Sequence, residues 1–233
     1  MLEYLIRTIY IQNCRTQTNI LKVKVPLKII GLIIAISANC VGQSEFIADS
    51  IRKEIPTRSD GEPDLFYQLT KQKESQLILD NLEEGYDSLQ IRIWYDYSLT
   101  DFRELVIFKY QNDIWEGKHY KYRVDWDFFN RKVTVLEKEF SEITPKSGWE
   151  IFTSYLFEKR IIELPDMREI EGLEDDIKDG VSYSVEIGTK NSYRFYNYHL
   201  TGFYTDFWQA KYMNEILKKI ESEFGIEYKI QKN

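Results

Sequence analysis

The clearest pattern along the chain is an alternation of apolar and polar residues between Asp179 and His199. Val181–Ile187 alternates with a period of two, which is typical of a strand with one buried face. Thr189–Asn191 predicts a three-residue turn, because Asn tolerates the left-handed backbone that such loops need. Tyr193–His199 supplies the return strand, so the whole segment predicts a β-hairpin.

The expected register of this hairpin separates an apolar face from a polar, aromatic face, and a slip of one residue would scramble both. The expected pairs are Ile187 with Tyr193, Val185 with Phe195, Glu186 with Arg194, Ser184 with Tyr196, and Ser182 with Tyr198. The polar face is a candidate binding platform; the alternative is a solvated sheet face held by an ordinary cross-strand ion pair. The candidate ligand-binding residues are therefore Glu186, Arg194, Tyr196 and Tyr198.

Four further segments predict strands, at residues 89–97, 104–110, 118–124 and 132–138. The first alternates apolar and polar residues, whereas the second is a denser apolar run, as expected for a central strand. Turn residues such as Gln111-Asn112-Asp113 lie between them. Consecutive strands with short connections favour an antiparallel meander.

Apolar residues at helical spacing predict three helices. The first covers residues 63 to about 84 and stops at Gly85, with a proline in its first position; because its middle, KQKESQ, is polar, two shorter helices are the alternative. The second begins at Ser147–Glu150, which matches a capping box. The last covers residues 205–224 and stops at Gly225. The fold class predicted is α+β: an antiparallel sheet of about six strands packed by the two later helices, with an N-terminal helix.

The N-terminal part has the pattern of an export signal. A basic region at Lys22–Lys28 precedes the apolar run Ile29–Ala38, which is too short for a comfortable transmembrane helix. Small residues follow, so we expect residues 1–42 to be a signal peptide cleaved before Gln43. Lipidation at Cys40 and an uncleaved anchor are the alternatives, and they are the only membrane contacts expected.

Residues 1–21 are unusual in front of such a signal, and we expect translation to start near Leu21. Residues 43–62 are polar and are interpreted as a leader, and residues 63–233 are expected to form a single domain. The expected location of the protein is therefore the periplasm, the cell surface or the extracellular space.

Removal of the signal changes the charge and the cysteine content. The chain has a net charge of −7; since residues 1–42 hold five basic residues and one acidic residue, the mature part carries −11. Such an acidic protein repels phosphate backbones, so no nucleic acid partner is expected. Cys14 and Cys40 both lie in this segment, which leaves the mature part without a disulfide, a thiol nucleophile or a cysteine metal site.

No motif in the sequence assigns an activity. His119 and His199 lack the spacing of HExxH, and no GxSxG, P-loop or GxGxxG motif is present. His119 is expected on an exposed face among basic residues. The acidic segment 163–180 fails the EF-hand pattern, because Ile177 occupies the third position counted from Asp175, which needs an oxygen ligand. We therefore expect no catalytic residue, no metal site and no cofactor.

Five segments resemble uncharacterised secreted proteins of Bacteroidota. They are DSLQIRIWYDY (87–97), LPD (164–166), DGVSYSVEI (179–187), YRFYNY (193–198) and FWQAKYMNEIL (207–217). The resemblance covers most of the mature chain and implies export and a shared α+β domain. Because the group has no assigned activity, it transfers no catalytic residue.

These observations favour a non-enzymatic exported module that binds a protein, a small molecule or a glycan through the polar face of the hairpin. The second hypothesis is a periplasmic hydrolase that uses carboxylate and Tyr residues, which a deep pocket with two carboxylates and aromatic walls would favour. The third is a structural role in the envelope. Tryptophans available for sugar stacking are Trp94, Trp115, Trp126 and Trp208, although aromatic side chains more often fill a β-rich core.

Overall fold

A computed structural model describes residues 51–127, 129–174 and 179–226. The expected signal peptide, residues 1–42, lies outside the described residues, so cleavage and lipidation stay predictions. Within the described ranges, no helix combines the length and the apolar character needed to cross a membrane.

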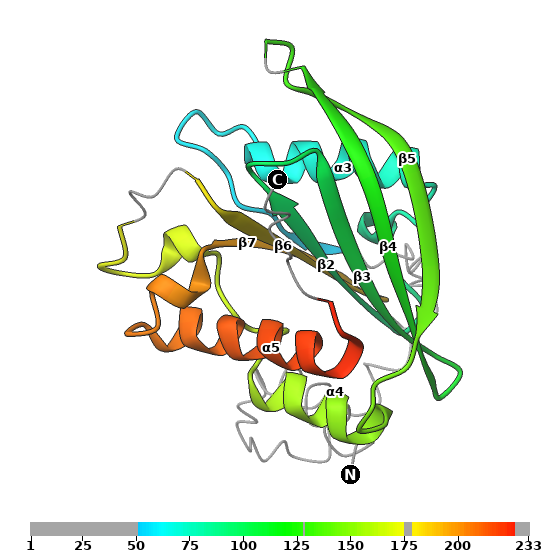
Figure 1. The fold of residues 1–233 in the computed structure, drawn as a ribbon. Coiled ribbons are helices and arrows are strands. Elements are labelled where there is room, and N and C mark those ends of the chain that lie inside the picture. The colour runs from blue at the N-terminus through cyan, green and yellow to red at the C-terminus, as the bar shows by residue number, and fades with distance from the viewer. Residues whose placement is uncertain (1–50, 128, 175–178, 227–233) are drawn as a thin grey trace, which may run out of the picture. The chain divides into compact units, whose positions relative to one another are not determined.

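The described part is built on one sheet with the strand order β1-β7-β6-β2-β3-β4-β5 (Figure 1). Its strands are β1 (Arg52–Glu54), β2 (Leu89–Tyr97), β3 (Phe102–Gln111), β4 (Ile114–Asp127), β5 (Lys132–Ile143), β6 (Val181–Thr189) and β7 (Ser192–His199). The predicted meander is observed as β2 to β5 in antiparallel order, with β3, β4 and β5 longer than expected.

The α+β class is confirmed, but the described sheet has seven strands and is mixed, not six-stranded and antiparallel. The added strand, β1, runs parallel to β7 and lies in the segment expected to be a polar leader. An ion pair between Glu54 and Arg194 joins the two strands. Three residues are too few to show an alternation, which is why the pattern along the chain missed β1.

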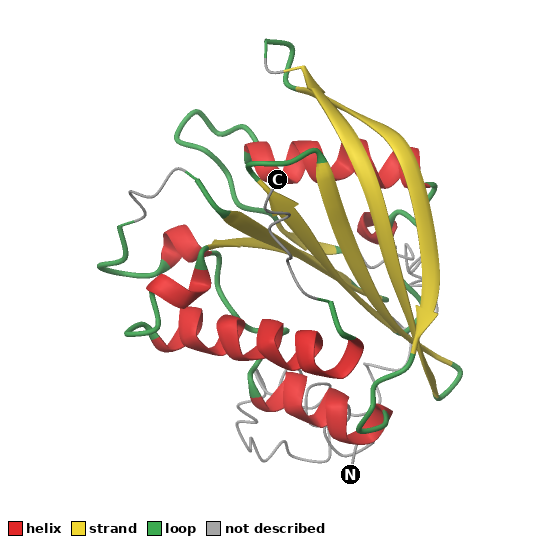
Figure 2. Cartoon of the chain, viewed as in Figure 1, coloured by secondary structure: helices red, strands yellow, loops and turns green. Residues whose placement is uncertain are grey.

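Three α-helices cover the two faces of the sheet in the described part (Figure 2). Helix α3 (Leu65–Leu77) packs on one face, and α4 (Trp149–Glu158) and α5 (Trp208–Phe224) pack on the other. Asp64 caps α3 by accepting a hydrogen bond from the backbone N–H of Phe66. The helix ends seven residues before Glu84, because Ile78 adopts the left-handed conformation and closes it.

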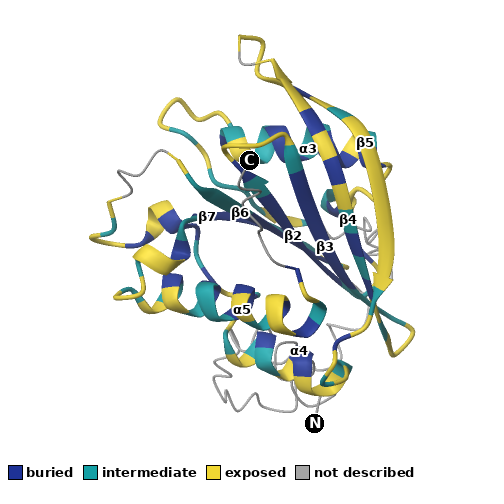
Figure 3. Cartoon of the chain, viewed as in Figure 1, coloured by how far each residue is buried: buried dark blue, intermediate teal, exposed yellow. Residues whose placement is uncertain are grey.

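Strand β2 shows how the sequence divides between the two cores. Ile91, Ile93 and the following odd-numbered positions face the core under α4 and α5, whereas Trp94 faces the smaller core under α3. Figure 3 shows β2 and β3 buried and much of β5 exposed at the edge of the sheet. Because both faces of β2 are covered, the polar residues Gln90 and Arg92 that alternate with its apolar residues are buried too and do not face solvent.

The second predicted helix is observed as α4, but the expected capping box is not formed. Gly148 occupies the N-cap and makes no side-chain cap hydrogen bond. The backbone N–H of Ser147 donates to Glu223 on α5 at 2.8 Å, so a carboxylate distant in sequence takes the role expected for Glu150. Burial alone would raise the pKa of Glu223, but hydrogen bonds from Lys219 and Ser147 outweigh it and lower this pKa to about 2.

Candidate functional site

The hairpin is observed, but its register differs by one residue from the expected one. Both strands extend towards the turn, leaving Lys190 and Asn191 as the loop, and Thr189 and Ser192 close it with a hydroxyl–hydroxyl hydrogen bond of 2.7 Å. Because this loop is one residue shorter than predicted, every pair shifts. The observed pairs are Ile187 with Arg194, Glu186 with Phe195, Val185 with Tyr196, Ser184 with Asn197, Tyr183 with Tyr198, and Ser182 with His199.

This register places the four candidate ligand-binding residues on two faces. Tyr196 and Tyr198 are buried in the core under α4 and α5, and the Tyr196 hydroxyl donates to the Ile161 carbonyl at 2.6 Å. Arg194 is half-buried and donates to the carbonyls of Ile162 and Leu164. Glu186 points to the opposite side, beneath α3. The four residues therefore do not form one exposed platform, and their role in binding stays a prediction.

The polar alternate residues of β2 form a row beneath α3. Gln90, Arg92 and Trp94 are buried, and the half-buried Asp96 ends the row. Charged groups removed from water are costly unless they are paired and hydrogen-bonded. Two buried ionic clusters supply those partners, one around Glu186 and one around Asp96.

The first cluster surrounds the carboxylate of Glu186, which has no solvent exposure. It accepts hydrogen bonds from Trp94 Nε1 at 2.8 Å, from the Tyr193 hydroxyl at 2.8 Å and from Lys71 Nζ at 3.2 Å. Burial alone would raise the pKa of Glu186, but the charges of Lys71 and Arg92 and these hydrogen bonds lower it. Glu186 is thus held as a buried anion.

Glu74 of α3 is a second carboxylate in the same cluster. It accepts a hydrogen bond from Lys71 and lies 3.5 Å from Nη1 of Arg92. Burial and the charge of Glu186 raise the pKa of Glu74 to about 7, against the effects of Lys71 and Arg92. The pKa values of the two carboxyls move apart, because the charges of Lys71 and Arg92 and the hydrogen bonds from Tyr193 and Trp94 lower that of Glu186, whereas burial and the charge of Glu186 raise that of Glu74.

The second cluster joins α3 to the far ends of β2 and β3. Lys73 Nζ donates to both oxygens of Asp96, at 2.8 and 2.7 Å, and Arg103 Nε lies 3.1 Å from the same carboxylate. Lys73 also lies over the ring of Trp94, 5.1 Å from its centroid. Burial lowers the pKa of Lys73, opposed by Asp96. One carboxylate therefore faces two cations.

A cavity of about 570 Å³ opens onto this second cluster, between the first turns of α3 and the sheet. This volume lies within the range of about 300–1,000 Å³ that is usual for small-molecule sites. The Lys73, Asp96 and Arg103 side chains form its polar floor. Its apolar wall includes Leu69, Val124, Val133, Phe66 and Trp126.

The mouth of this cavity combines aromatic rings with carboxylates. Phe66 and Trp126 are 39% and 38% exposed. Asp101 and Asp125 are exposed beside them, and Asp101 is ion-paired with Arg123. The cavity can therefore take a ligand with an apolar body, with polar groups available both at the floor and at the rim.

The structure places the two histidines in different surroundings. His119 is buried, contrary to the exposed position expected for it, and its Nε2 lies 3.0 Å from Glu104 in the core under α4 and α5. His199 lines the cavity described above. Among the described residues, no group of three His, Cys, Asp or Glu side chains is arranged to hold a metal ion. Residues 175–178 of the acidic segment lie outside the described residues.

Comparisons with models of protein families, with curated proteins and with solved structures find no match for this chain.

Sequence reasoning missed Lys73, Asp96 and Arg103. Lys73 lies in the polar KQKESQ stretch, which weakened the prediction of a continuous helix, and Asp96 was interpreted as a polar alternate of a half-buried strand. The polar residues that alternate along β2 were the available signal, because β2 pairs with a strand on each side and is therefore central in the sheet.

Proposed function

We propose that this protein is a non-enzymatic exported binding module that holds a small molecule in the cavity between α3 and the sheet. The observation that carries the proposal is an apolar cavity of about 570 Å³ whose floor is the buried Lys73–Asp96–Arg103 cluster. A cavity with mostly apolar walls and a few convergent polar groups is the usual form of a ligand site. The export part rests on the apolar run Ile29–Ala38 behind its basic region.

The charges of the floor favour an acceptor group on the ligand. Arg103 and Lys73 share the single carboxylate of Asp96, so the floor has one more cationic group than anionic group. A carboxylate, carbonyl or hydroxyl oxygen of the ligand is the natural partner for such a floor. Trp126 and Phe66 at the mouth suit stacking with a sugar ring or with another flat or apolar body.

Binding is favoured over catalysis by the state of the carboxylates. Hydrolysis of a glycoside requires one carboxyl that stays protonated to act as an acid. The hydrogen bond from Arg123 lowers the pKa of Asp101, which acts against that role. Asp96 is held between two cations, Lys73 and Arg103, which stabilise its charged form and act against a role as the acid.

A hydrolase is the second candidate, and one observation favours it. Three carboxylates, those of Asp96, Asp101 and Asp125, line a cavity with aromatic walls. A panel of chromogenic glycosides and esters tests this function. Turnover that Asp125→Asn abolishes, with ligand binding retained, would replace the binding module with an enzyme.

Thermal shift measurements against a panel of sugars, amino acids and small carboxylic acids test the binding function. A ligand of this cavity is expected to raise Tm of the wild-type protein and to lose at least tenfold in affinity with Trp126→Ala. Trp208→Ala is the matched control, since Trp208 is 44% exposed but lies on α5, away from the lining residues. Equal losses with both variants, or no effect of Trp126→Ala, would contradict the proposed site.

A further inference from the structure

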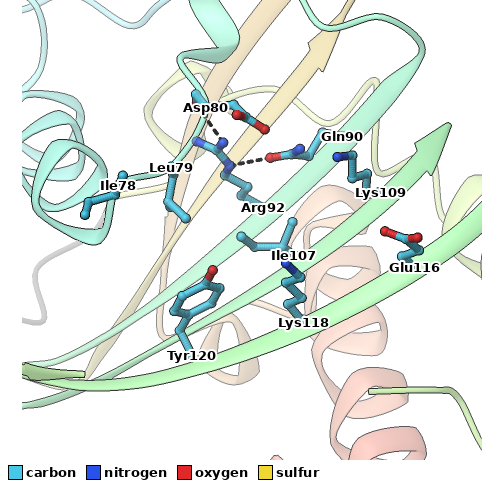
Figure 4. Close-up of a pocket in the computed structure, with 10 residues that line it drawn as sticks. All are labelled: Ile78, Leu79, Asp80, Gln90, Arg92, Ile107, Lys109, Glu116, Lys118 and Tyr120. Atoms are coloured by element: carbon cyan, nitrogen blue, oxygen red, sulfur yellow. Dashed lines mark hydrogen bonds between the residues drawn. The ribbon is translucent and has the colours of Figure 1, made fainter. Parts of the chain in front are cut away.

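A second, smaller cavity lies at the other end of α3. Its volume is about 220 Å³, and it is formed by the residues that follow α3 together with the near ends of β2, β3 and β4 (Figure 4). Unlike the larger cavity, it is bordered mainly by charged and amide side chains. These charged and amide residues are Arg92, Lys109, Lys118, Asp80, Glu116 and Gln90.

Two half-buried lysines supply the positive charge of this cavity. Lys109 lies over the ring of Tyr86, 5.5 Å from its centroid, and Lys118 lies over Phe140 at the same distance. Among the ion pairs of the described residues, neither ammonium has a carboxylate partner within 4.0 Å. Both ammonium groups therefore retain the capacity to pair with an added anion.

Arg92 closes the cavity behind the lysines and is held rigidly. Its Nε donates to Gln90 Oε1 at 2.7 Å, and its Nη2 donates to the Asp80 carbonyl at 2.7 Å (Figure 4). Nη1 is buried and makes no hydrogen bond to a described residue, and it lies 3.5 Å from a Glu74 oxygen and 3.7 Å from a Glu186 oxygen, so these two carboxylates share the charge of Arg92. A fixed guanidinium is pre-organised, so little side-chain entropy is lost when an anion approaches it.

The carboxylates of this cavity lie at its outside. Asp80 and Glu116 are both exposed, whereas Arg92 is 1% exposed and the lysines are half-buried. An ion entering the cavity therefore meets its positive charges in the less solvated part, where electrostatic interactions are stronger.

We propose that this cavity binds a small oxyanion, a phosphate or carboxylate group, between Lys109 and Lys118 with Arg92 behind it. A volume of about 220 Å³ admits a group of a few heavy atoms and is too small for most whole ligands of drug size. The site is separate from the cavity of the proposed function and does not depend on it. Its two ammonium groups come from neighbouring strands, Lys109 on β3 and Lys118 on β4, so substitutions on both strands are expected to affect binding.

Calorimetric titrations at constant, low ionic strength test this site with three probes: inorganic phosphate, methyl phosphate and acetate. Saturable binding of at least one probe is expected, and Lys109→Gln and Lys118→Gln are each expected to weaken it at least fivefold. Lys121→Gln is the matched control, because Lys121 is exposed on the opposite face of β4. Binding of the phosphates without acetate identifies a phosphate site, and the reverse identifies a carboxylate site.

The proposal is overturned by the absence of saturable binding of all three probes. It is equally overturned if Lys121→Gln weakens binding as much as the other two variants, which would indicate general attraction to surface charge. Should one glutamine variant fail to fold, Lys109→Met or Lys118→Met replaces it, since methionine keeps the packing of the stem on the neighbouring ring. Circular dichroism of every variant checks that the fold is intact.

Discussion

The indole Nε1 of Trp94 donates a hydrogen bond of 2.8 Å to the carboxylate of Glu186, and neither side chain is exposed to solvent. The bond joins neighbouring strands, β2 and β6, inside the sheet face that α3 covers. It ties a residue of the hairpin to the polar row of β2, which connects the two cavities. Glu186 therefore helps to fix the positions of the buried side chains between α3 and the sheet.

Glu186→Gln is expected to lower the free energy of unfolding by about 3 kcal/mol, because the buried Arg92 and the half-buried Lys71 then lose a charged partner. Urea unfolding measures the change. Glu139→Gln is the control, since Glu139 is exposed opposite Lys121 and its loss is expected to cost less than about 1 kcal/mol. Similar values for both variants would contradict the buried cluster.

Stability is expected to fall as the pH rises from about 4.5 to 7. The pKa of Glu74 is raised from 4.5 to about 7 on folding by burial and by Glu186, so the folded protein holds a proton that the unfolded chain has released. The folded state binds more protons in this window, and the free energy of unfolding therefore decreases with pH. The lowered pKa of Glu186 acts below this window, where stability is lost as the pH falls.

Chemical unfolding of the wild type and of Glu74→Gln between pH 5 and 7 measures this dependence. The glutamine variant is expected to show a flatter profile, because its side chain does not titrate. An unchanged slope in the variant would assign the dependence to other groups.

The start of α4 offers a test of where its cap lies. Glu223→Gln is expected to cost about 1–2 kcal/mol, because the charge-assisted hydrogen bond from Ser147 N–H and the ion pair with Lys219 are both weakened. Glu150→Gln is expected to change little, since Glu150 is exposed and makes no cap. The opposite order of the two effects would restore the capping box that the sequence predicts.

Gly117 on β4 is expected to tolerate no side chain. A Cβ there would lie 2.8 Å from the backbone oxygen of Ile143 and 2.8 Å from the ring of Trp149. Gly117→Ala is therefore expected to destabilise the protein by about 1–3 kcal/mol, measured by thermal unfolding. Gly202→Ala is the control, since its Cβ would meet only a side-chain oxygen at 3.7 Å. Equal Tm values for Gly117→Ala and the wild type would contradict this, because they would show that β5 and α4 can move apart to admit the methyl group.

The larger elements of the fold could be predicted from periodicity alone. Leu89–Tyr97 is observed with the predicted bounds, and the hairpin and the last helix are observed close to theirs. Each of these segments has many apolar residues at the spacing of one kind of element, so a single residue that departs from the pattern does not change the prediction. β1 carries no such signal, since its pairing with β7 depends on residues 140 positions away.

The candidate site could not be predicted in the same way. The hairpin register depended on whether Thr189 belongs to the loop or to the strand, and that single residue moved Glu186 and Arg194 onto opposite faces. The area of the sheet that α3 covers is a tertiary property that the periodicity of the strands does not report. Polar residues such as Arg92 and Asp96 therefore looked solvent-facing, whereas α3 and its lysines enclose them.

A crystal structure of the protein with the ligand that most raises its Tm tests the central claim most directly. The account predicts that the ligand lies in the cavity between α3 and the sheet, with an acceptor group within hydrogen-bond distance of Lys73 or Arg103 and its apolar body against Trp126. A ligand bound instead on the open edge of β5, or anywhere without contact to these residues, would contradict it.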